Sequence, residues 1–507
     1  MSHKTLRDRF NKIDGLRSEV LERAFTFASF TIPRLFPDRF FQGTNTTTNL
    51  PETYSSKPGV SVRKLADMMT NALFPPNDVP FFELKLSPEL TEEQTEALRT
   101  PVQEVERIVL DTYQASNYRT VLRTSLEHAI VMGDSLIFQM DVDRYKVYHL
   151  AHFMIRRDGD GLIKEYWTVD WVVTDYLDDD LKALNGGKVK HQRGEHEPLY
   201  TRIFLEDKIW RVEKEFRDAT IDEDTTYEVL PYYHIGWTPV AGEDYSRSLV
   251  EELFGTIRSN ELNEKALVEG TVAGSEGRIL LDPTSTTTID DIEGTVNWQV
   301  ISARPGTIES FQPNVGSSIQ TALLAKAKYE SEIDEAFLAA SAGNLTQDRT
   351  TAFQVNAVAS ERSQALSGVL SVTEQNLEPS VEFTITRLIK NKKVAKEFKE
   401  LMDSDGLVVS ISSGIDALGR QADGIRLEAM VRIAFETQDP EMLAVLKKVN
   451  IMQGIARNSG LDMNQYIKTE EEIAQEQAAR QQQQLQAAAA QQTVESAGAI
   501  AEGNLTP

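Results

Sequence analysis

The chain has 507 residues, of which 40% are apolar and 26% are charged, as expected for a folded, water-soluble protein with several packing units. Its net charge is −25, whereas proteins that grip nucleic acid by its phosphates are usually basic. This charge excludes a protein that coats DNA. It leaves open both an acidic enzyme and a passage through which DNA slides without sticking.

The sequence has no cysteine, which excludes disulfides, thiolate chemistry and cysteine-based zinc sites. The first ten residues, MSHKTLRDRF, lack the apolar stretch of a signal peptide. No run approaches the roughly 18 apolar residues that a membrane helix needs. We therefore expect neither secretion by that route nor a membrane partner.

The first third of the sequence predicts helices. Residues 5–30 are charged and amphipathic, and residues 61–73 carry apolar side chains at helical spacing. A capping box at Thr91 predicts a short helix, and Pro101 is expected to open another. An apolar stripe over residues 121–130 predicts the next helix.

Residues from about 135 to 240 predict an antiparallel β region, interrupted by the polar loop Asp178–Glu197. The expected strand pairs are 135–140 with 145–150, 153–157 with 162–169, and 199–205 with 209–216. Asp158-Gly159-Asp160-Gly161 is a strong hairpin signal between the second pair.

A small β module is expected between two long helices. The first helix covers residues 245–274; it carries an apolar stripe over residues 249–257, but its continuation from Arg258 to Lys265 is polar almost all round and needs partners of its own kind. Short strands are predicted at 278–281, 298–302 and 308–311, and the second helix at 317–340.

A polar loop, residues 341–349, follows the second helix. A very long helix is expected over 350–399, with a kink or break at Pro379, and then a strand over 406–411. Helix starts are expected near Asp439 and again near residue 469, before a Gln- and Ala-rich tail that favours helix but offers few anchors.

Two short patterns suggest metal sites but have plainer explanations. His149 and His152 could offer two ligands, yet an i, i+3 pair on a strand points to opposite faces, so two ordinary strand histidines are favoured. The segment from Asp158 to Gly161 resembles part of a calcium loop but lacks the closing Glu, so a hairpin turn is favoured.

No enzyme motif is present. The sequence has no GxxxxGK[ST] or GxGxxG nucleotide loop and no GxSxG elbow. We therefore expect no enzyme and no cofactor. If DNA is pumped past this protein, another protein does the pumping.

The densest basic cluster has two open interpretations. It is either a solvated helix end, where cations oppose the helix dipole, or a contact with DNA or an acidic neighbour. Its members are Arg387, Lys390, Lys392, Lys393, Lys396 and Lys399.

Several segments, in order from about residue 30 to 420, together resemble the portal (head-to-tail connector) family of short-tailed bacteriophages. They are Phe30–Pro37 (FTIPRLFP), Ala72–Pro75 (ALFP), Gly242–Ser248 (GEDYSRS), Asp348–Ala352 (DRTTA) and Ile411–Arg420 (ISSGIDALGR). Ser246 stands where the family has glycine, and Phe353-Gln354 where it usually has acids. The last 80 residues resemble the family only in character.

The resemblance implies an α+β, mainly helical portal fold with wing, stem, clip and crown. The implied parts are a wing at 1–244, stem helices at 245–274 and 316–340, a clip at 275–315, a tunnel loop and long wing helix at 341–399, a crown at 400–470, and a tail at 471–507 that is a helical barrel or disordered.

The resemblance also implies a ring of twelve subunits around phage double-stranded DNA, located at the portal vertex of the virion after assembly in the host cytoplasm. The implied partners are terminase, a tail adaptor, and the major capsid and scaffolding proteins. A different head-tail structural protein, such as an adaptor or scaffold, is the alternative, and an enzyme with an unrecognised site is a third reading.

The resemblance places specific residues at functional positions. An acidic lumen would keep DNA from sticking, and Arg349 would act as a sparse grip. The implied channel loop consists of Gly343, Asn344, Leu345, Thr346, Gln347, Asp348 and Arg349. The implied docking face of the clip contains Arg278, Asp290, Asp291 and Trp298.

Overall fold

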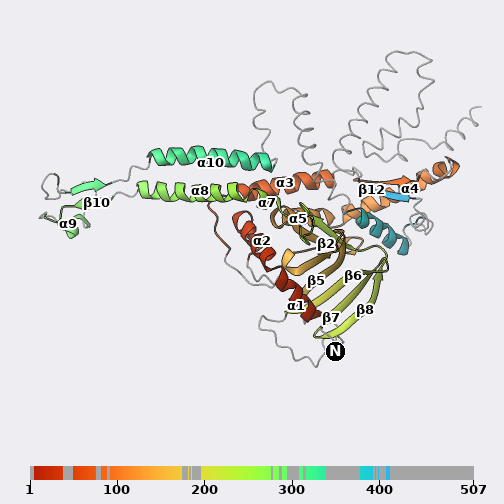
Figure 1. The fold of residues 1–507 in the computed structure, drawn as a ribbon. Helices are drawn as coiled ribbons and strands as arrows, with labels where there is room; N and C mark the ends of the chain where they lie inside the picture. Colours follow the sequence, from red (N-terminus) through yellow and green to blue (C-terminus); the bar gives the residue numbers. More distant parts are fainter. Residues whose placement is uncertain are drawn as a thin grey trace, which may run out of the picture. The chain divides into compact units, whose positions relative to one another are not determined.

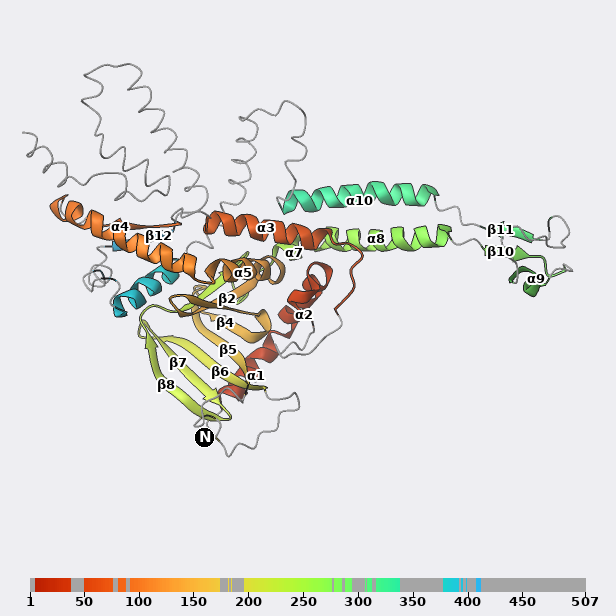
Figure 2. The ribbon, with the colours of Figure 1, turned by 180° about the vertical axis from the view of Figure 1, so that it is seen from behind.

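The computed structural model describes residues 5–37, 50–75, 81–87, 92–173, 181, 184, 196–275, 278–284, 288–293, 306, 308–311, 316–337, 377–391, 394, 398 and 407–411. The chain separates into two units, residues 1–74 with 81–414, and residues 75–80 with 415–507. All elements below belong to the first unit, and Figures 1 and 2 show them from opposite sides.

Two helices, not one, occupy the N-terminal region. Helix α1 (Leu6–Leu16) and helix α2 (Ser18–Phe30) confirm the helical prediction for residues 5–30 and are separated at Arg17, a break that the amphipathic pattern did not predict. The Arg17 side chain is 3% exposed and donates hydrogen bonds to the carbonyls of Leu150 (2.7 Å), Phe153 (2.5 Å) and Ala151 (3.1 Å). These bonds to a distant segment hold the chain at the break.

Three further helices precede the sheets: α3 (Lys57–Leu73), α4 (Glu92–Ala115) and α5 (Tyr118–Met132). The prediction that Pro101 opens a new helix was wrong, because α4 runs through it. A proline inside a helix removes one backbone hydrogen bond, and the buried stripe of Val102, Val105 and Val109 packs α4 on the core. The 3₁₀ helix η1 (Pro33–Leu35) links α2 to the segment before α3.

Strands β2 (Asp134–Asp141), β3 (Arg144–Tyr148) and β9 (Tyr232–Gly236) form a three-stranded antiparallel sheet in the order β3-β2-β9. The predicted pairing of 135–140 with 145–150 is confirmed, with Leu136 opposite Tyr148. The strand ends at Tyr148 instead of Leu150, because Leu150–His152 form the 3₁₀ helix η2.

A five-stranded antiparallel sheet has the order β4-β5-β6-β7-β8. Its strands are β4 (Phe153–Arg157), β5 (Ile163–Val173), β6 (His196–Glu206), β7 (Ile209–Phe216) and β8 (Ala219–Tyr227). The two predicted hairpins are confirmed, and β8 extends the sheet beyond them.

The core lies between helices α2, α3 and α5 and the sheets. Val62, Met69, Leu122 and Leu136 are fully buried there, which removes their apolar surface from water. Helix α1 packs separately on the five-stranded sheet, with Phe10 6.5 Å from the ring of Trp167.

The predicted helix–β–helix pattern is present. Helix α7 (Leu249–Glu252) and helix α8 (Phe254–Ser275) replace the single helix expected over 245–274. That helix cannot begin at 245, because the backbone of Arg247 forms an antiparallel β-bridge with Thr238. Ser248 then caps α7, since its Oγ accepts the Glu251 N–H (3.0 Å). Strand β10 (Arg278–Leu281), helix α9 (Ile289–Glu293) and strand β11 (Ile308–Phe311) precede helix α10 (Gly316–Ala336). The strand expected at 298–302 lies outside the described residues.

The C-terminal part of the first unit returns to the N-terminal helices. Residues 377–390 are helical, with Pro379 in their first turn, and residue 391 is a turn. The helix is therefore not continuous to 399 as predicted; its last α-type bond runs from the Asn391 N–H to the Arg387 carbonyl (3.0 Å), and residue 394 is a bend. The predicted strand is confirmed as β12 (Leu407–Ile411), which pairs with β1 (Phe82–Leu86).

Among the residues that the structure describes, no helix is both long enough and apolar enough to cross a membrane.

Candidate functional site

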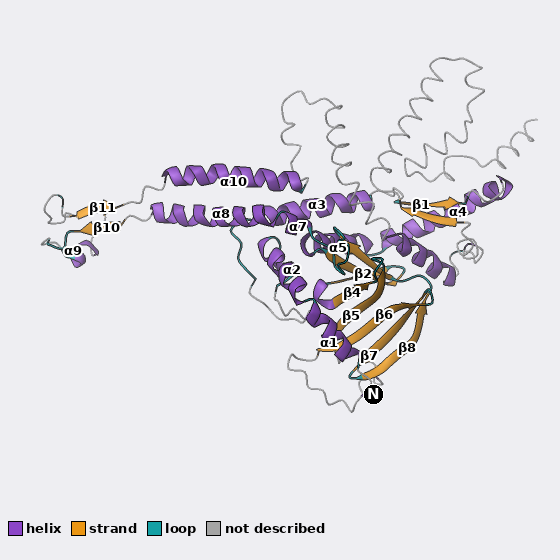
Figure 3. Cartoon of the chain, viewed as in Figure 1, coloured by secondary structure: helices purple, strands orange, loops and turns teal. Residues whose placement is uncertain are grey.

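Helices α8 and α10 lie side by side and run in opposite directions (Figure 3). Their contacts are mostly polar. Thr256 Oγ1 donates to Glu332 (3.4 Å), Asn263 Nδ2 donates to the Ala322 carbonyl (2.9 Å), and Lys326 pairs with Glu264 (2.5 Å). The pKa of Lys326 is raised, chiefly by its hydrogen bond to Glu264.

Little of this helix pair is buried within one chain. Only Ile257, Asn260 and Leu267 of α8 and Ile333 of α10 are buried. Several large apolar side chains are about half exposed or more: Leu262, Val268, Val272, Leu323 and Leu324. Leu324 is 75% exposed. Because water-exposed apolar surface of this extent marks contact sites, the pair is suited to packing against further copies or partners.

The pair carries more acid than base. Arg258, Lys265, Lys326 and Lys328 oppose a larger acidic set: Glu261, Glu264, Glu269, Glu330, Glu332, Asp334 and Glu335. An acidic surface repels phosphates and supplies no counterion-release gain to DNA.

A polar junction fixes α8 and α10 to the segment before α3. The Glu261 carboxylate accepts the backbone N–H groups of Tyr54 (2.6 Å) and Ser55 (2.8 Å), and Asn260 Nδ2 donates to Ser55 Oγ (2.8 Å). Lys57 pairs with Asp334 of α10 at 2.6 Å. We call these contacts the junction. No sequence motif predicts the junction, because the residues that pair in it are some 200 or more positions apart in the chain.

The module between the two helices is built on one strand pair. In that pair Arg278 lies opposite Phe311 and Leu281 opposite Ile308. Asp290 and Asp291 both lie in α9, where Asp290 is exposed beside Ile289, which is 64% exposed. Three of the four predicted docking residues, Arg278, Asp290 and Asp291, thus lie in this module.

Trp298, the fourth predicted docking residue, lies outside the described residues. So does the predicted channel loop 343–349.

Of the basic cluster, the structure describes two members. Arg387 lies over the Phe383 ring, with 5.2 Å between its Cζ and the ring centroid, and Lys390 is exposed in the last helical turn. Lys392, Lys393, Lys396 and Lys399 lie outside the described residues. The position of Lys390 fits a solvated helix end, and the contact with DNA or an acidic neighbour stays untested.

The predicted histidine pair proves to be part of a cluster of three, in which His128 and His149 are buried and His152 is partly buried. His149 is not on a strand but caps η2, where its Nε2 donates to the Leu35 carbonyl (2.7 Å) and its Nδ1 accepts from Ala151 N (3.0 Å). The rings of His128 and His152 lie 5.6 and 5.8 Å from that of His149. Both nitrogens of His149 are therefore used, which leaves no lone pair for a metal.

Burial favours the uncharged form of His128 and His149. It lowers the pKa of His128 to about 4, and it lowers the pKa of His149, whose neighbours His128 and His152 act in the same direction. No group of three or more acidic or histidine side chains among the described residues could hold a metal ion.

The segment from Asp158 to Gly161 is a hairpin turn. Asp158 Oδ1 accepts the backbone N–H groups of Asp160 (3.0 Å) and Leu162 (2.9 Å), and Gly161 has a φ of 82°. The carboxylate is used to close the turn, which explains why the pKa of Asp158 is lowered, first of all by the bond from Leu162.

A buried network holds the helix over residues 377–390 against the body. Gln139 donates to Tyr145 Oη (2.9 Å) and Thr384 Oγ1 (2.8 Å), and accepts from Tyr233 Oη (2.6 Å). Tyr113 Oη and Ser380 Oγ are 2.7 Å apart. A fully paired buried network fixes the register of a helix, because a slip would leave polar groups without partners.

The model of the bacteriophage head to tail connecting protein family matches residues 3–467. The chain belongs to this family. By sequence, this chain is similar to the portal protein of Escherichia phage T7, with 27% identity over 493 residues that cover 92% of this chain and 89% of the relative.

The portal protein of Enterobacteria phage T3 is 27% identical over 488 residues, covering 91% and 88% of the two chains. That of Enterobacteria phage SP6 is 21% identical over 487 residues, covering 92% and 91%. This chain is thus similar to each of these three portal proteins over almost the whole length of that protein.

Among solved structures, a chain in the neck of an empty gene transfer agent particle is similar with a TM-score of 0.39 and 11% identity. The similarity covers 79% of this chain and 90% of that chain.

Proposed function

We propose that this chain is the portal subunit of a short-tailed bacteriophage, which forms a ring that passes double-stranded DNA into the capsid during packaging and out of it during ejection. The observation that carries the proposal is the family match over residues 3–467, together with relatives named portal proteins along nearly their whole length. The role is structural and requires no cofactor.

The helix–β–helix segment supports the proposed division of this part of the chain into stem and clip. We assign the stem to α8 and α10 and the clip to residues 275–315, the part where terminase and then the tail adaptor would dock. The wing is residues 1–244 with the long helix ending near 390, and the crown and tail follow from about 400. The pairing of β12 with β1 ties the first residues of the proposed crown to the wing range.

The stem is suited to a ring of identical subunits. A closed ring uses heterologous interfaces, in which one face of each subunit meets a different face of the next. Helices with few buried side chains and an exposed leucine on each, Leu262 on α8 and Leu324 on α10, offer apolar surface for neighbouring subunits. We propose twelve subunits, as the family resemblance implies.

The acidic surplus of the stem supports a lumen that DNA does not stick to, since each like-charged contact opposes phosphate binding. We propose that loop 343–349 lies at the narrowest part of the channel and that Arg349 supplies a sparse grip there. Capsid and scaffolding proteins would surround the ring at the portal vertex of the virion, after assembly in the host cytoplasm.

The test is the native mass of the purified protein, with negative-stain images of the same chromatographic peak. We expect a particle near twelve times 56.9 kDa with a central hole. A monodisperse monomer or dimer that persists at high protein concentration would overturn the proposal and favour an adaptor.

A further inference from the structure

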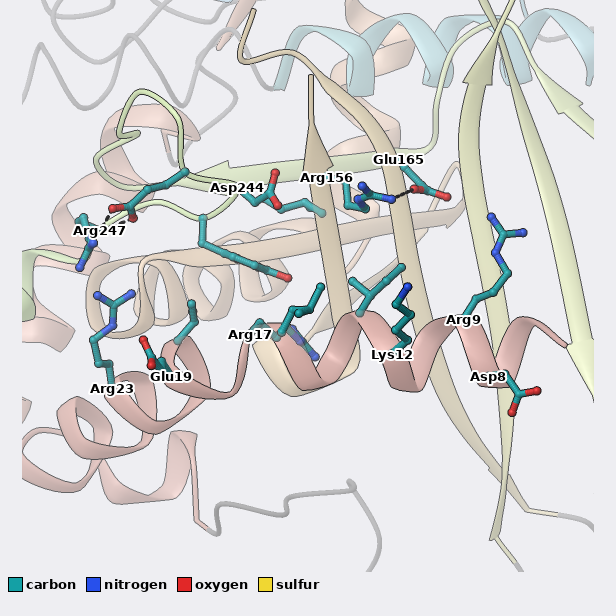
Figure 4. Close-up of a pocket in the computed structure, with 16 residues that line it drawn as sticks. Asp8, Arg9, Lys12, Arg17, Glu19, Arg23, Arg156, Glu165, Asp244 and Arg247 are labelled. Carbon is teal, nitrogen blue, oxygen red and sulfur yellow. Dashed lines mark hydrogen bonds and ion pairs between the residues drawn. The ribbon is translucent and has the colours of Figure 1, made fainter. Parts of the chain in front are cut away.

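A cleft of about 880 Å³ lies outside the stem, between helices α1 and α2 on one side and strands β4 and β5 with loop 243–247 on the other (Figure 4). The channel, the clip and the junction use none of its residues. Its lining combines charged side chains with an apolar strip, which is the composition of a peptide-binding surface.

The walls of the cleft are held in place by buried hydrogen bonds. Arg17, between α1 and α2, binds three carbonyls of residues 150–153. At the start of α1, Glu215 of β7 accepts the backbone N–H groups of Leu6 (2.5 Å) and Arg7 (3.1 Å). A cleft formed in advance binds without the cost of ordering its walls.

One end of the cleft presents more positive charge than its own carboxylates neutralise. Arg9 and Lys12 lie one turn apart on α1, and Figure 4 shows both side chains extending from the helix toward the strands. Among the described residues neither has a carboxylate within 4.0 Å, and Arg9 lies over the Trp167 ring at 5.4 Å. Arg156 approaches from β4 with a side chain that is 57% exposed; it pairs with Glu165 at 3.4 Å, but that carboxylate is shared with Arg202, which lies closer at 2.5 Å.

At the other end of the cleft the arginines are paired with carboxylates. Arg247 is paired with Glu243 (2.5 Å) and Glu251 (2.6 Å), which also contacts Arg23 (3.5 Å). Glu19, exposed on α2, has no ion pair among the described residues. A ligand therefore finds cations at the Arg9 end and an unpaired carboxylate at the Glu19 end, which sets its direction.

Between these ends α1 and α2 contribute an apolar strip of Ile13, Leu16 and Val20. The Leu16 side chain is 81% exposed, the largest value among the exposed large apolar side chains of the described part of the chain. A nucleic acid or a free phosphate would leave this strip in water, whereas a peptide with aliphatic side chains would cover it.

We propose that this cleft binds an acidic peptide segment of a partner protein, with its carboxylates on Arg9, Lys12 and Arg156 and an aliphatic side chain on Leu16. The net charge of −25 makes this local cation group an exception on an acidic protein, so it guides an acidic segment to one place. The inference does not rest on the portal ring.

The experiment measures fluorescence anisotropy of the full-length protein with a short fluorescein-labelled peptide that has several acidic residues at one end and adjacent leucines in the middle. We expect saturable binding that weakens with salt and is about tenfold weaker for the double variant Arg9→Glu, Lys12→Glu. Leu16→Ser should weaken binding at all salt concentrations, and because Leu16 is exposed the variant keeps its fold, as circular dichroism would verify.

The matched control is Lys64→Glu, which reverses an exposed lysine on α3 without an ion pair among the described residues and should leave binding unchanged. Equal loss in Lys64→Glu and in the double variant would show general electrostatic attraction and overturn the proposal. The absence of binding to the wild-type protein would also overturn it. So would tighter binding of a single-stranded oligonucleotide at the same residues. The ring mass is measured separately and does not depend on any of these results.

Discussion

Acidification should weaken the fold through the buried histidine cluster. Burial lowers the pKa of His128 to about 4, against about 6.5 in the unfolded chain. The unfolded state therefore binds the proton more readily, and the stability that His128 allows at neutral pH is lost as the pH falls from about 6.5 toward 4. At pH 5 this loss is about 2 kcal/mol, because one pKa unit corresponds to about 1.36 kcal/mol.

The assay is urea unfolding at pH 7.5 and at pH 5, followed by circular dichroism, for the wild type and for His128→Leu. The variant removes a buried Nδ1 that has no hydrogen-bond partner, so it should cost little at pH 7.5. It should lose about 2 kcal/mol less than the wild type on going to pH 5.

The control for this prediction is Thr124→Leu, which changes a side chain without a titratable group on the same helix, α5. Because it removes no titratable group, it should lose as much stability as the wild type on going to pH 5. An equal loss of stability in the wild type and in His128→Leu would refute the reasoning, because the acid sensitivity would then come from other groups.

Three further changes test the junction, the ring and the channel. Glu261→Ala removes the acceptor of the Tyr54 and Ser55 N–H groups and should lower the free energy of unfolding by about 1–3 kcal/mol, measured by urea titration. If the proposed ring is correct, Leu324→Asp should shift native mass toward smaller species while circular dichroism stays unchanged. Arg349→Ala should alter the retention of packaged DNA, assayed by nuclease protection, with ring mass unchanged; unaltered retention would remove Arg349 as a grip.

Local patterns predicted most of the elements correctly because local chemistry decides them. The hairpin at Asp158 follows from a turn whose carboxylate and glycine act within five residues, and the β10–β11 pair from short apolar runs on either side of a polar segment. The helix–β–helix order around residues 245–337 follows from spacing alone.

Errors arose where distant partners decide the structure. The break at Arg17 depends on carbonyls more than 130 residues away, and the single helix through Pro101 depends on packing against the core. The pairing of β1 with β12 joins segments more than 300 residues apart, so neither strand's pattern could reveal the other. His128 joined the predicted His149 and His152 for the same reason.

Contacts between distant residues also bear on how the proposed stem would work. If apolar contacts alone held α8 and α10 to the body, they would not fix the position of the helix pair along the body, because such contacts are not directional. Apolar contacts are present, since Ile257 and Ile333 are buried in the core and the Phe254 ring lies 5.1 Å from that of Phe27. The carboxylate of Glu261, the amide of Asn260 and the Lys57–Asp334 pair add one defined register, since any shift would leave these groups unpaired. The exposed apolar residues then remain available for neighbours. In the proposed ring, we therefore expect the polar junction to keep the orientation of the stem on its own body while the exposed apolar residues meet neighbouring subunits.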